Sequence, residues 1–270
     1  MRHASSACDV AGNRCINRKT PLHFGDVLQR ASALLNFLTI PGSLRAAFRA
    51  PKVSVPSISL VGTLRAMGVR PTSVIDVGAN EGQFTSACLA YSPATSVLAI
   101  EALPDLKVRL DRVFAGHSNV TVVGKGCGCR QEKRVFHANE YAKSSSFLSL
   151  ATRHREAFPG ATRTDDIEVE VLPLDLIMEQ HAVAVPELLK LDVQGFELEV
   201  LKGASKCLRG TRHILMETSF VRLYEEEPLF LDCLAFLSQF GFVFRGPVGF
   251  LTDPRTGVFL QMDALFERAP

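Results

Sequence analysis

The chain has 270 residues, of which 47% are hydrophobic and 21% are charged. This composition is ordinary for a folded globular domain, and the length suffices for one large α/β domain with a small extension. The net charge of +2 favours no class of partner, but the absence of Trp and the presence of only three Tyr leave few side chains to stack on bases. We therefore expect no nucleic-acid binding.

Basic residues are concentrated near the N-terminus. Residues 1–52 hold eight Lys or Arg against Asp9 and Asp26, a net charge of +6, and the remainder holds 22 basic against 26 acidic residues, a net charge of −4. We expect residues 1–19 to be a disordered basic tail and residues 20–56 to form a helical extension and a linker. Three roles are open for this segment: packing on the core, contact with a second copy in a homodimer, and peripheral contact with an anionic membrane surface.

The sequence indicates neither a membrane span nor a metal centre. No apolar run reaches the length of a bilayer crossing, and the first 20 residues are too polar for a secretory signal peptide. Among the seven cysteines, the pair Cys127-Gly-Cys129 lacks the two-residue spacer usual in zinc and redox sites, and Cys8 with Cys15 has no second pair nearby. We therefore expect free thiols, no bound metal and a cytoplasmic location.

The rest of the chain is organised around residues 73–82, which read Ser-Val-Ile-Asp-Val-Gly-Ala-Asn-Glu-Gly. The β-branched run before Gly78 predicts a strand buried in a parallel sheet, Gly78 and Gly82 bracket a tight turn, and residues 83–91 are typical of a helix. A dinucleotide fingerprint has glycine where Asn80 stands, and no Lys-Ser/Thr pair follows as in a P-loop. The turn therefore suits a cofactor without phosphate, such as S-adenosylmethionine.

Two acids stand beside this turn. Asp76 lies at the end of the strand, where its carboxylate could fix the turn and meet the cationic amino group of the cofactor. Residues 96–100 predict the next strand, and Glu101 follows it at the place where an acid can hold a ribose diol. In the alternative interpretation, Glu101 caps the helix that begins near Pro104.

Strands and helices alternate through the chain, which predicts an α/β fold with a mostly parallel sheet, and we assign residues 57–270 to this one domain. The other expected elements are a helix over 57–68, a helix over 106–114, a strand over 119–123, an antiparallel strand over 135–137, a strand over 167–172, a helix over 175–181, a strand that carries Asp192 to its end, a helix over 196–208, a strand over 211–216, a helix over 228–240, and a last antiparallel pair over 242–244 and 257–261.

Acids stand at the ends of four predicted strands, namely Asp76, Glu101, Asp192 and Glu217. Ligands of an open α/β sheet bind outside the carboxyl ends of its strands. We therefore expect these carboxylates to gather around one site, although some of them will act as helix caps.

The longest motifs resemble those of the FkbM family of S-adenosylmethionine-dependent methyltransferases. The resemblance covers roughly residues 70–245 and is carried by DVGANEGQFT at 76–85, the serines of 144–146, KLDVQGFE at 190–197, LKGA at 201–204, and Glu217. It implies a Rossmann-like class I methyltransferase fold, with the predicted C-terminal antiparallel hairpin. It also implies O-methylation of a hydroxyl on a sugar, glycolipid or polyketide-type acceptor.

The resemblance further implies roles for single residues. It places Asp192 beside the transferred methyl group, and it places the cofactor against Asp76, Gly78, Ala79, Asn80, Gly82 and Glu101. Many class I methyltransferases carry an acid after the third strand that accepts a hydrogen bond from the adenine amino group. This chain has Gly-Lys-Gly-Cys at 124–127 instead, so we expect backbone groups to recognise the adenine.

Several interpretations of Asp192 stay open. It could act as a general base or orient the acceptor hydroxyl, and Lys190 on the same face could alter its basicity. It could instead bind the amino group of the cofactor, pin the loop through Gln194, or ligate magnesium together with Glu217. The alternative to a typical methyltransferase is a non-catalytic or metal-assisted member of the same fold that serves a biosynthetic assembly. The sequence does not identify the acceptor.

Overall fold

The computed structural model describes residues 39–49, 53–139, 146–148, 164–253 and 256–269. The expected basic tail over 1–19 and most of the expected extension over 20–56 lie outside these residues. None of the helices in the described ranges is both long enough and apolar enough to cross a membrane.

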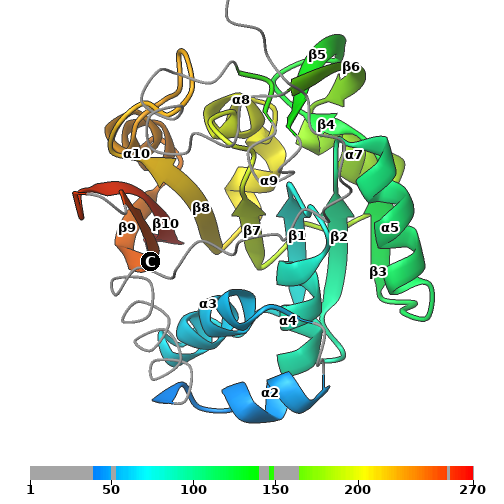
Figure 1. Ribbon diagram of the computed structural model, residues 1–270, viewed down its shortest axis with the longest axis vertical. Helices are drawn as coiled ribbons and strands as arrows, with labels where there is room; N and C mark the ends of the chain where they lie inside the picture. The colour runs from blue at the N-terminus through cyan, green and yellow to red at the C-terminus, as the bar shows by residue number, and fades with distance from the viewer. Residues whose placement is uncertain (1–38, 50–52, 140–145, 149–163, 254–255, 270) are drawn as a thin grey trace, which may run out of the picture.

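A seven-stranded sheet forms the centre of the protein (Figure 1). In spatial order its strands are β3 (Val120–Val123), β2 (Ser96–Ile100), β1 (Ser73–Val77), β7 (Leu188–Leu191), β8 (His213–Ser219), β10 (Phe259–Arg268) and β9 (Phe242–Thr252). Neighbouring strands from β3 to β8 pair in parallel, whereas β10 is antiparallel to both β8 and β9. The predicted Rossmann-like sheet with its antiparallel C-terminal hairpin is therefore confirmed.

The strand order reverses at the middle of the sheet. The chain proceeds outward from β1 to β2 and β3, and it then returns to place β7 on the other side of β1. The carboxyl ends of β1 and β7 thus form a topological switch point, which is where ligands of open α/β sheets bind.

Helices from the N-terminal part of the described chain cover one face of the sheet. The helices α2 (Ser43–Arg49), α3 (Val55–Ala66) and α4 (Gln83–Tyr91) share an apolar cluster with the strand residues Val74 and Leu215. Ala46 of α2 is buried in this cluster. The part of the expected extension that the structure describes therefore packs on the core.

A larger apolar cluster covers the opposite face. It joins Ile75 and Leu189 of the sheet to α7 (Leu174–Gln180), α8 (Glu197–Lys202), α9 (Ser205–Gly210) and α10 (Phe230–Ser238). At the edge near β3, α5 (Pro104–Phe114) packs Leu110 and Phe114 against Ala79. The sheet is consequently buried on both faces, as the apolar sequences of β1 and β7 require.

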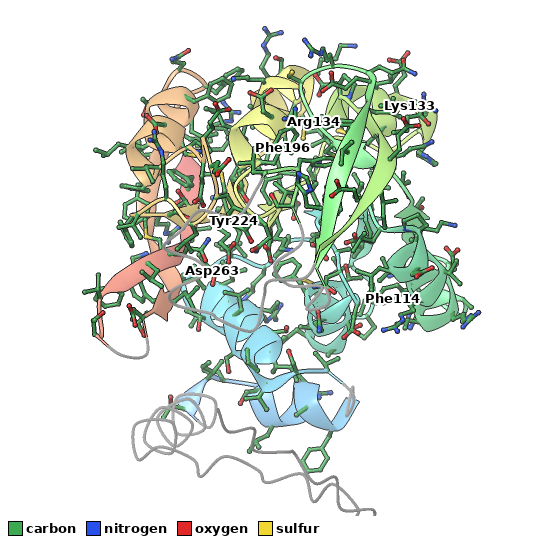
Figure 2. All side chains as sticks on the ribbon, turned by 45° about the horizontal axis from the view of Figure 1, so that its top comes forward. Phe114, Lys133, Arg134, Phe196, Tyr224 and Asp263 are labelled. Carbon is green, nitrogen blue, oxygen red and sulfur yellow. The ribbon has the colours of Figure 1, made fainter. Side chains whose placement is uncertain are left out.

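A smaller sheet lies beyond the carboxyl ends of β1 and β2 (Figure 1). Its strands, in spatial order, are β4 (Gly126–Cys127), β6 (Thr164–Leu172) and β5 (Glu132–Asn139). The predicted antiparallel strand over 135–137 is confirmed as part of β5 and is longer than expected. The ring of Phe196, after β7, lies against Phe147 at 4.9 Å and under the guanidinium of Arg134 at 4.7 Å, which fixes the small sheet to the main one (Figure 2).

The single helix predicted over 196–208 is wrong, because the structure has α8 and α9 with a break at Gly203. A Cβ on Gly203 would lie 2.0 Å from the carbonyl oxygen of Gly128, so the chain must pass here without a side chain. The new helix α9 begins where Asp175 accepts hydrogen bonds from the backbone N–H groups of Lys206 and Cys207 at 2.7 and 2.9 Å. Such capping satisfies donors that a helix start leaves unpaired.

The last strands are longer than the sequence predicts. The strand β8 continues to Ser219, so Glu217 lies inside this strand. The prediction that Glu217 stands at the end of the strand is therefore wrong. Antiparallel pairing with β10 carries the ladder through these polar positions, up to the pair of Gln261 with Ser219. The start of the helix α3 also differs from the prediction. This helix begins at Val55, with Ser54 as its N-cap, and not at Ser57.

Every cysteine in the described ranges is a free thiol, as predicted. These residues are Cys88, Cys127, Cys129, Cys207 and Cys233. Burial raises the pKa of Cys207 to about 12, which keeps this thiol protonated at neutral pH. Cys8 and Cys15 lie outside the described residues.

Gly203→Ala should destabilise the fold by ~1–3 kcal/mol, because its new methyl group would collide with backbone that cannot rotate away. Urea denaturation followed by circular dichroism measures the change. Gly116→Ala is the matched control, since a Cβ there meets no heavy atom within 4 Å. Equal stability of the two variants would show that the close approach to Gly128 does not constrain the helix break.

Candidate active site

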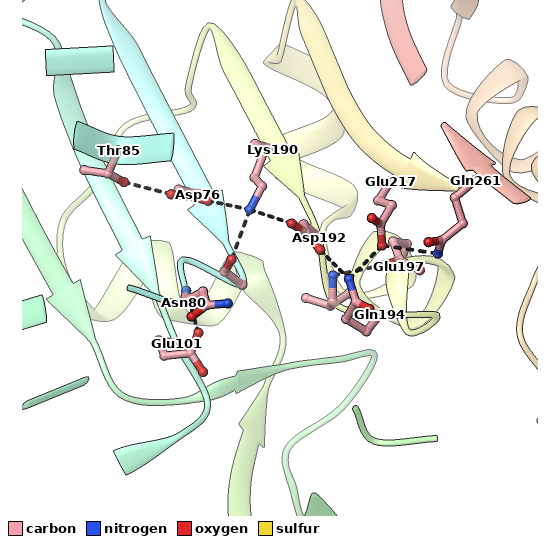
Figure 3. A network of polar contacts seen from close by, with 12 residues as sticks. Asp76, Asn80, Thr85, Glu101, Lys190, Asp192, Gln194, Glu197, Glu217 and Gln261 are labelled. Atoms are coloured by element: carbon pink, nitrogen blue, oxygen red, sulfur yellow. Dashed lines mark hydrogen bonds and ion pairs between the residues drawn. The ribbon is translucent and has the colours of Figure 1, made fainter. Parts of the chain in front are cut away.

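A continuous network of polar contacts crosses the carboxyl ends of β1, β7 and β8 (Figure 3). It runs from Asp76 through Lys190 to Asp192, and then through Gln194 to Glu217. Glu101 lies beside it, across the turn that follows β1. The structure therefore brings the four sequence-predicted acids to one end of the sheet.

The turn after β1 is held in an unusual backbone conformation. Gly78, Asn80 and Gly82 have positive φ angles of 76°, 51° and 79°. The N–H groups of Gly78 and Ala79 both donate to the carbonyl oxygen of Ile100, which ties the turn to β2. Glycine is well suited to such left-handed positions because it has no Cβ.

Gly78 also permits the closest approach in the site. A Cβ on Gly78 would lie 1.9 Å from the carbonyl oxygen of Asp192, and the N–H of Asp192 donates to the carbonyl oxygen of Val77 at 3.1 Å. The two segments that carry the family resemblance therefore touch each other through their backbones.

Asp76 is fully buried, and its carboxylate is engaged by protein groups. Its Oδ2 accepts a hydrogen bond from the Thr85 hydroxyl at 2.8 Å, and its Oδ1 lies 3.0 Å from Nζ of Lys190. Lys190 also donates to the carbonyl oxygen of Gly78 at 3.0 Å. Of the two predicted roles of Asp76, the structure shows that it fixes the turn, while its contact with a cofactor stays a prediction.

Of the two roles that the sequence leaves open for Glu101, the structure shows the contact at the helix start, while its contact with a ribose stays a prediction. Its Oε1 accepts from the N–H of Leu103 at 2.9 Å, which caps the start of α5, and its Oε2 accepts from the N–H of Asn80 at 2.8 Å. Burial raises the pKa of Glu101, although these two hydrogen bonds oppose the shift. A carboxylate has about four acceptor positions, so Glu101 keeps acceptor capacity for a ligand at the turn.

Asp192 follows directly on β7, and 39% of its side chain is exposed. Its Oδ2 lies 3.5 Å from Nζ of Lys190, and its Oδ1 accepts a hydrogen bond from Nε2 of Gln194 at 2.8 Å. Asp192 is thus oriented from two sides while its carboxylate stays accessible at the switch point.

Gln194 is the branching point of the network, a role for which the sequence gives no signal beyond a loop contact. Its φ angle is +54°, and its Nε2 donates to both Asp192 and Oε2 of Glu217, the latter at 2.7 Å. Its Oε1 accepts from the hydroxyl of Tyr224 at 2.8 Å, and its carbonyl oxygen accepts from the hydroxyl of Ser146 at 2.6 Å. The whole side-chain amide is therefore used to fix the carboxylates.

Glu197 holds the backbone of the same loop. Its Oε1 accepts from the N–H groups of Val193 and Gly195 at 3.0 and 3.2 Å. Burial raises the pKa of Glu197 to about 8, although the hydrogen bond from the N–H of Val193 opposes the shift. The buried acid therefore stays largely protonated at neutral pH.

The geometry does not favour the magnesium site considered for Asp192 and Glu217. The two N–H bonds of the Gln194 amide point at these two carboxylates, so a donor occupies the space that a bridging cation would need. In the part of the chain that the structure describes, no group of three or more His, Cys, Asp or Glu is arranged to hold a metal ion.

A model described as the methyltransferase FkbM domain matches residues 76–244, which is more than half of the chain. The chain belongs to this family. This membership confirms the family that the sequence motifs predict, and with it a methyltransferase domain that uses S-adenosylmethionine.

Two curated proteins share part of this sequence. Hexuronic acid methyltransferase AglP of Haloferax volcanii is 28% identical over 142 residues, which cover 53% of this chain and 54% of that protein. The 2-O-methyltransferase NoeI of Sinorhizobium fredii is 25% identical over 183 residues, which cover 65% of this chain and 75% of that protein. The match with AglP thus spans about half the length of that relative.

A solved structure is also similar. The crystal structure of methyltransferase FkbM from Methylobacillus flagellatus KT aligns with a TM-score of 0.47 and 16% sequence identity, over 89% of this chain and 60% of that chain.

Glu197→Gln should flatten the pH dependence of stability. The native state holds a proton on Glu197 up to about pH 8, whereas the ordinary value is 4.5, so the folded chain binds more protons between these values and wild-type stability falls as the pH rises. Each proton contributes ~1.4 kcal/mol per pH unit to this slope, and glutamine cannot titrate. Urea midpoints from about pH 5 to about pH 8 measure the difference.

Glu199→Gln, on the same helix, is the control for this titration. Burial raises the pKa of Glu199, but hydrogen bonds with Lys202 and Cys129 outweigh burial and lower it overall from its ordinary value of 4.5. The charged form therefore stabilises the fold at every pH above this value, so Glu199→Gln should lower stability by a constant amount and leave the slope over the measured range unchanged. A wild-type slope unchanged by Glu197→Gln would contradict the assignment of the buried proton to Glu197.

Proposed function

We propose that the protein transfers a methyl group from S-adenosylmethionine to a hydroxyl of a sugar-type acceptor, with Asp192 as the catalytic residue. The observation that carries this proposal is the position of Asp192, which is accessible at the switch point and oriented by Lys190 and Gln194. Two relatives, a hexuronic acid methyltransferase and a 2-O-methyltransferase, support a sugar hydroxyl as the acceptor.

The chemistry of the turn after β1 suits the proposed donor. The carboxylates of Asp76, Glu101 and Asp192 border this turn, and such acids would repel a pyrophosphate but attract a cation. The remaining acceptor positions of Glu101 suit the hydroxyls of a ribose. We assign the cofactor contacts to Gly78, Ala79, Asn80, Gly82 and Glu101, and we give Asp76 a supporting part through Lys190 and Thr85.

When bound, S-adenosylmethionine supplies a methyl group on a positively charged sulfur. Asp192 would orient the acceptor hydroxyl and accept its proton as the oxygen forms a bond to the methyl carbon and the carbon–sulfur bond breaks. The proton then resides on Asp192, and the products are a methyl ether and S-adenosylhomocysteine. A positioned base contributes ~10²–10⁴-fold to such a step.

Lys190 and Gln194 would act as positioning residues for this step. Lys190 carries its charge in the site, since Asp76 and Asp192 outweigh the effect of burial and raise its pKa overall. Because Lys190 and Gln194 each face one oxygen of Asp192, the carboxylate has a fixed orientation before an acceptor arrives. Preorganisation of this kind lowers the cost of aligning the reacting groups.

Glu101→Gln should weaken the binding of S-adenosylhomocysteine by ~1.5–3 kcal/mol, the value of hydrogen bonds to a charged group. Isothermal titration calorimetry measures this affinity, and a thermal melt checks that the cap of α5 survives. Glu81→Gln is the matched control, because Glu81 lies in the same turn with a half-exposed side chain that pairs with Arg109. Unchanged affinity in a folded Glu101→Gln protein would remove Glu101 from the cofactor site.

Asp192→Asn should reduce turnover by ~10²-fold or more and leave the affinity for S-adenosylhomocysteine nearly unchanged, because asparagine keeps the shape but cannot take the proton. Formation of S-adenosylhomocysteine with a panel of phenyl glycosides measures turnover, and Asp111→Asn on the surface of α5 is the control. Weak cofactor binding with turnover restored at saturation would show instead that Asp192 anchors the cofactor.

A further inference from the structure

The proposed acceptor side of the site continues from Asp192 onto β8 and β10. Glu217 lies directly opposite Asp263 in the antiparallel ladder, and Ser219 lies opposite Gln261. Alternate residues of a strand share a face, so these four side chains stand together on one side of the sheet. We call them the β8/β10 polar row.

Two members of this row are partly exposed, whereas Ser219 and Gln261 are buried. On β8, Leu215 stands two positions before Glu217, and on β10, Leu265 stands two positions after Asp263. Both leucines are buried against α3 and α4, whereas Glu217 and Asp263 are partly exposed. Glu217 accepts a hydrogen bond from Gln194, the residue that the Tyr224 hydroxyl holds in place. The row is therefore continuous with the network that orients Asp192.

The strand β9 leaves room for one of these carboxylates. Gly249 pairs with Asp263, and a Cβ at Gly249 would lie 2.4 Å from Oδ2 of Asp263. In the described ranges, the Asp263 carboxylate makes no side-chain hydrogen bond or ion pair. Asp263 thus offers free acceptor capacity beside the proposed acceptor position.

The hydrogen-bond donors that reach the carboxyl group of Glu217 are neutral amides. Glu217 accepts from the amides of Gln194 and Gln261, at 2.7 and 3.3 Å. The cation beside the site, Lys190, is already shared between Asp76 and Asp192.

The acids in and beside the row act on one another, and the two members of the row respond differently. Burial, and then the neighbouring acids Asp192 and Asp263, raise the pKa of Glu217 well above its usual range, which favours the protonated, neutral form of this side chain. Burial and Asp192 raise the pKa of Asp263 to about 6. Asp263 is therefore mostly ionised at neutral pH, so a further carboxylate would meet like charge at Asp263, whereas a hydroxyl group would meet an acceptor.

We infer that the β8/β10 polar row selects a neutral, polyhydroxylated sugar as the acceptor and rejects a uronic acid. In this arrangement Asp263 accepts a hydrogen bond from a hydroxyl beside the one that is methylated and repels a carboxylate, and Glu217 forms a hydrogen bond with a second hydroxyl. This inference rests on the proposed function and narrows it. It separates this chain from its relative AglP, which is named for a hexuronic acid.

The experiment compares pairs of glycosides that differ only at the sixth carbon, namely methyl glucoside, galactoside and mannoside against the corresponding methyl uronides. Binding to the full-length protein loaded with S-adenosylhomocysteine is measured by saturation-transfer NMR, and methylation with S-adenosylmethionine is measured in parallel. At least one neutral glycoside should be favoured over its uronide by ~10-fold or more, since like charges oppose the uronide.

The double variant Glu217→Gln, Asp263→Asn should reduce this preference several-fold, mainly by admitting the uronide. The matched control is Asp105→Asn, Asp111→Asn, which removes two charges from the surface of α5 at the other side of the sheet. A wild-type protein that takes a uronide as well as its neutral partner, or a preference that the double variant leaves unchanged, would overturn the inference.

Failure of the inference can be distinguished from failure of the proposed function. If S-adenosylhomocysteine binds but none of the glycosides does, the inference about the acceptor is wrong while the cofactor assignment stands. If S-adenosylhomocysteine does not bind, the proposed function itself is wrong, and the inference is lost with it.

Discussion

The ammonium group of Lys190 holds the two halves of the candidate site together. It lies 3.0 Å from Asp76 of β1, donates to the carbonyl oxygen of Gly78 and lies 3.5 Å from Asp192. A buried acid deprived of its cation typically costs ~3–5 kcal/mol, so Asp76 and Lys190 each require the other. The turn after β1 and the loop after β7 are thereby fixed relative to each other. The position of that loop in turn determines where Asp192 and Gln194 lie on the acceptor side.

This constraint changes how the glycine turn is understood. Gly78 belongs to a motif that resembles a cofactor-binding signature. A Cβ added at this position would nevertheless collide with the carbonyl oxygen of Asp192, even with no ligand present. The glycine is therefore needed first for the contact between β1 and β7, and the open backbone that a cofactor can use follows from that contact. The same close approach places Asp192 beside the turn. One substitution at Gly78 would therefore disturb both the proposed cofactor binding and the proposed role of Asp192 toward the acceptor hydroxyl.

Local patterns predicted the parts of the site that short segments determine. The apolar runs before Asp76 and Glu101 end at the carboxyl edge of the sheet, so these two acids could be placed without a structure. The apolar residues of the predicted strand end at Met216, before Glu217, whereas pairing with β10 continues the strand beyond Glu217. The contact of Tyr224 with Gln194 spans 30 positions, and no periodicity reveals it. The opposition of Asp263 to Glu217 likewise exists only once the C-terminal hairpin has folded onto β8.

Gln194 has a left-handed backbone conformation although it carries a Cβ. Its place between the acids Asp192 and Glu217 gives a reason for this conformation. Two carboxylates in direct contact would share a proton, and neither would then be a free acceptor. The Gln194 amide stands between Asp192 and Glu217, donates one N–H to each and is held by Tyr224, so the two acids are kept apart and each has a hydrogen-bond donor. The backbone strain at φ +54° therefore accompanies an arrangement in which the site keeps its negative potential. That potential is suited to a cationic methyl donor on one side of Asp192 and to a hydroxyl-bearing acceptor on the other.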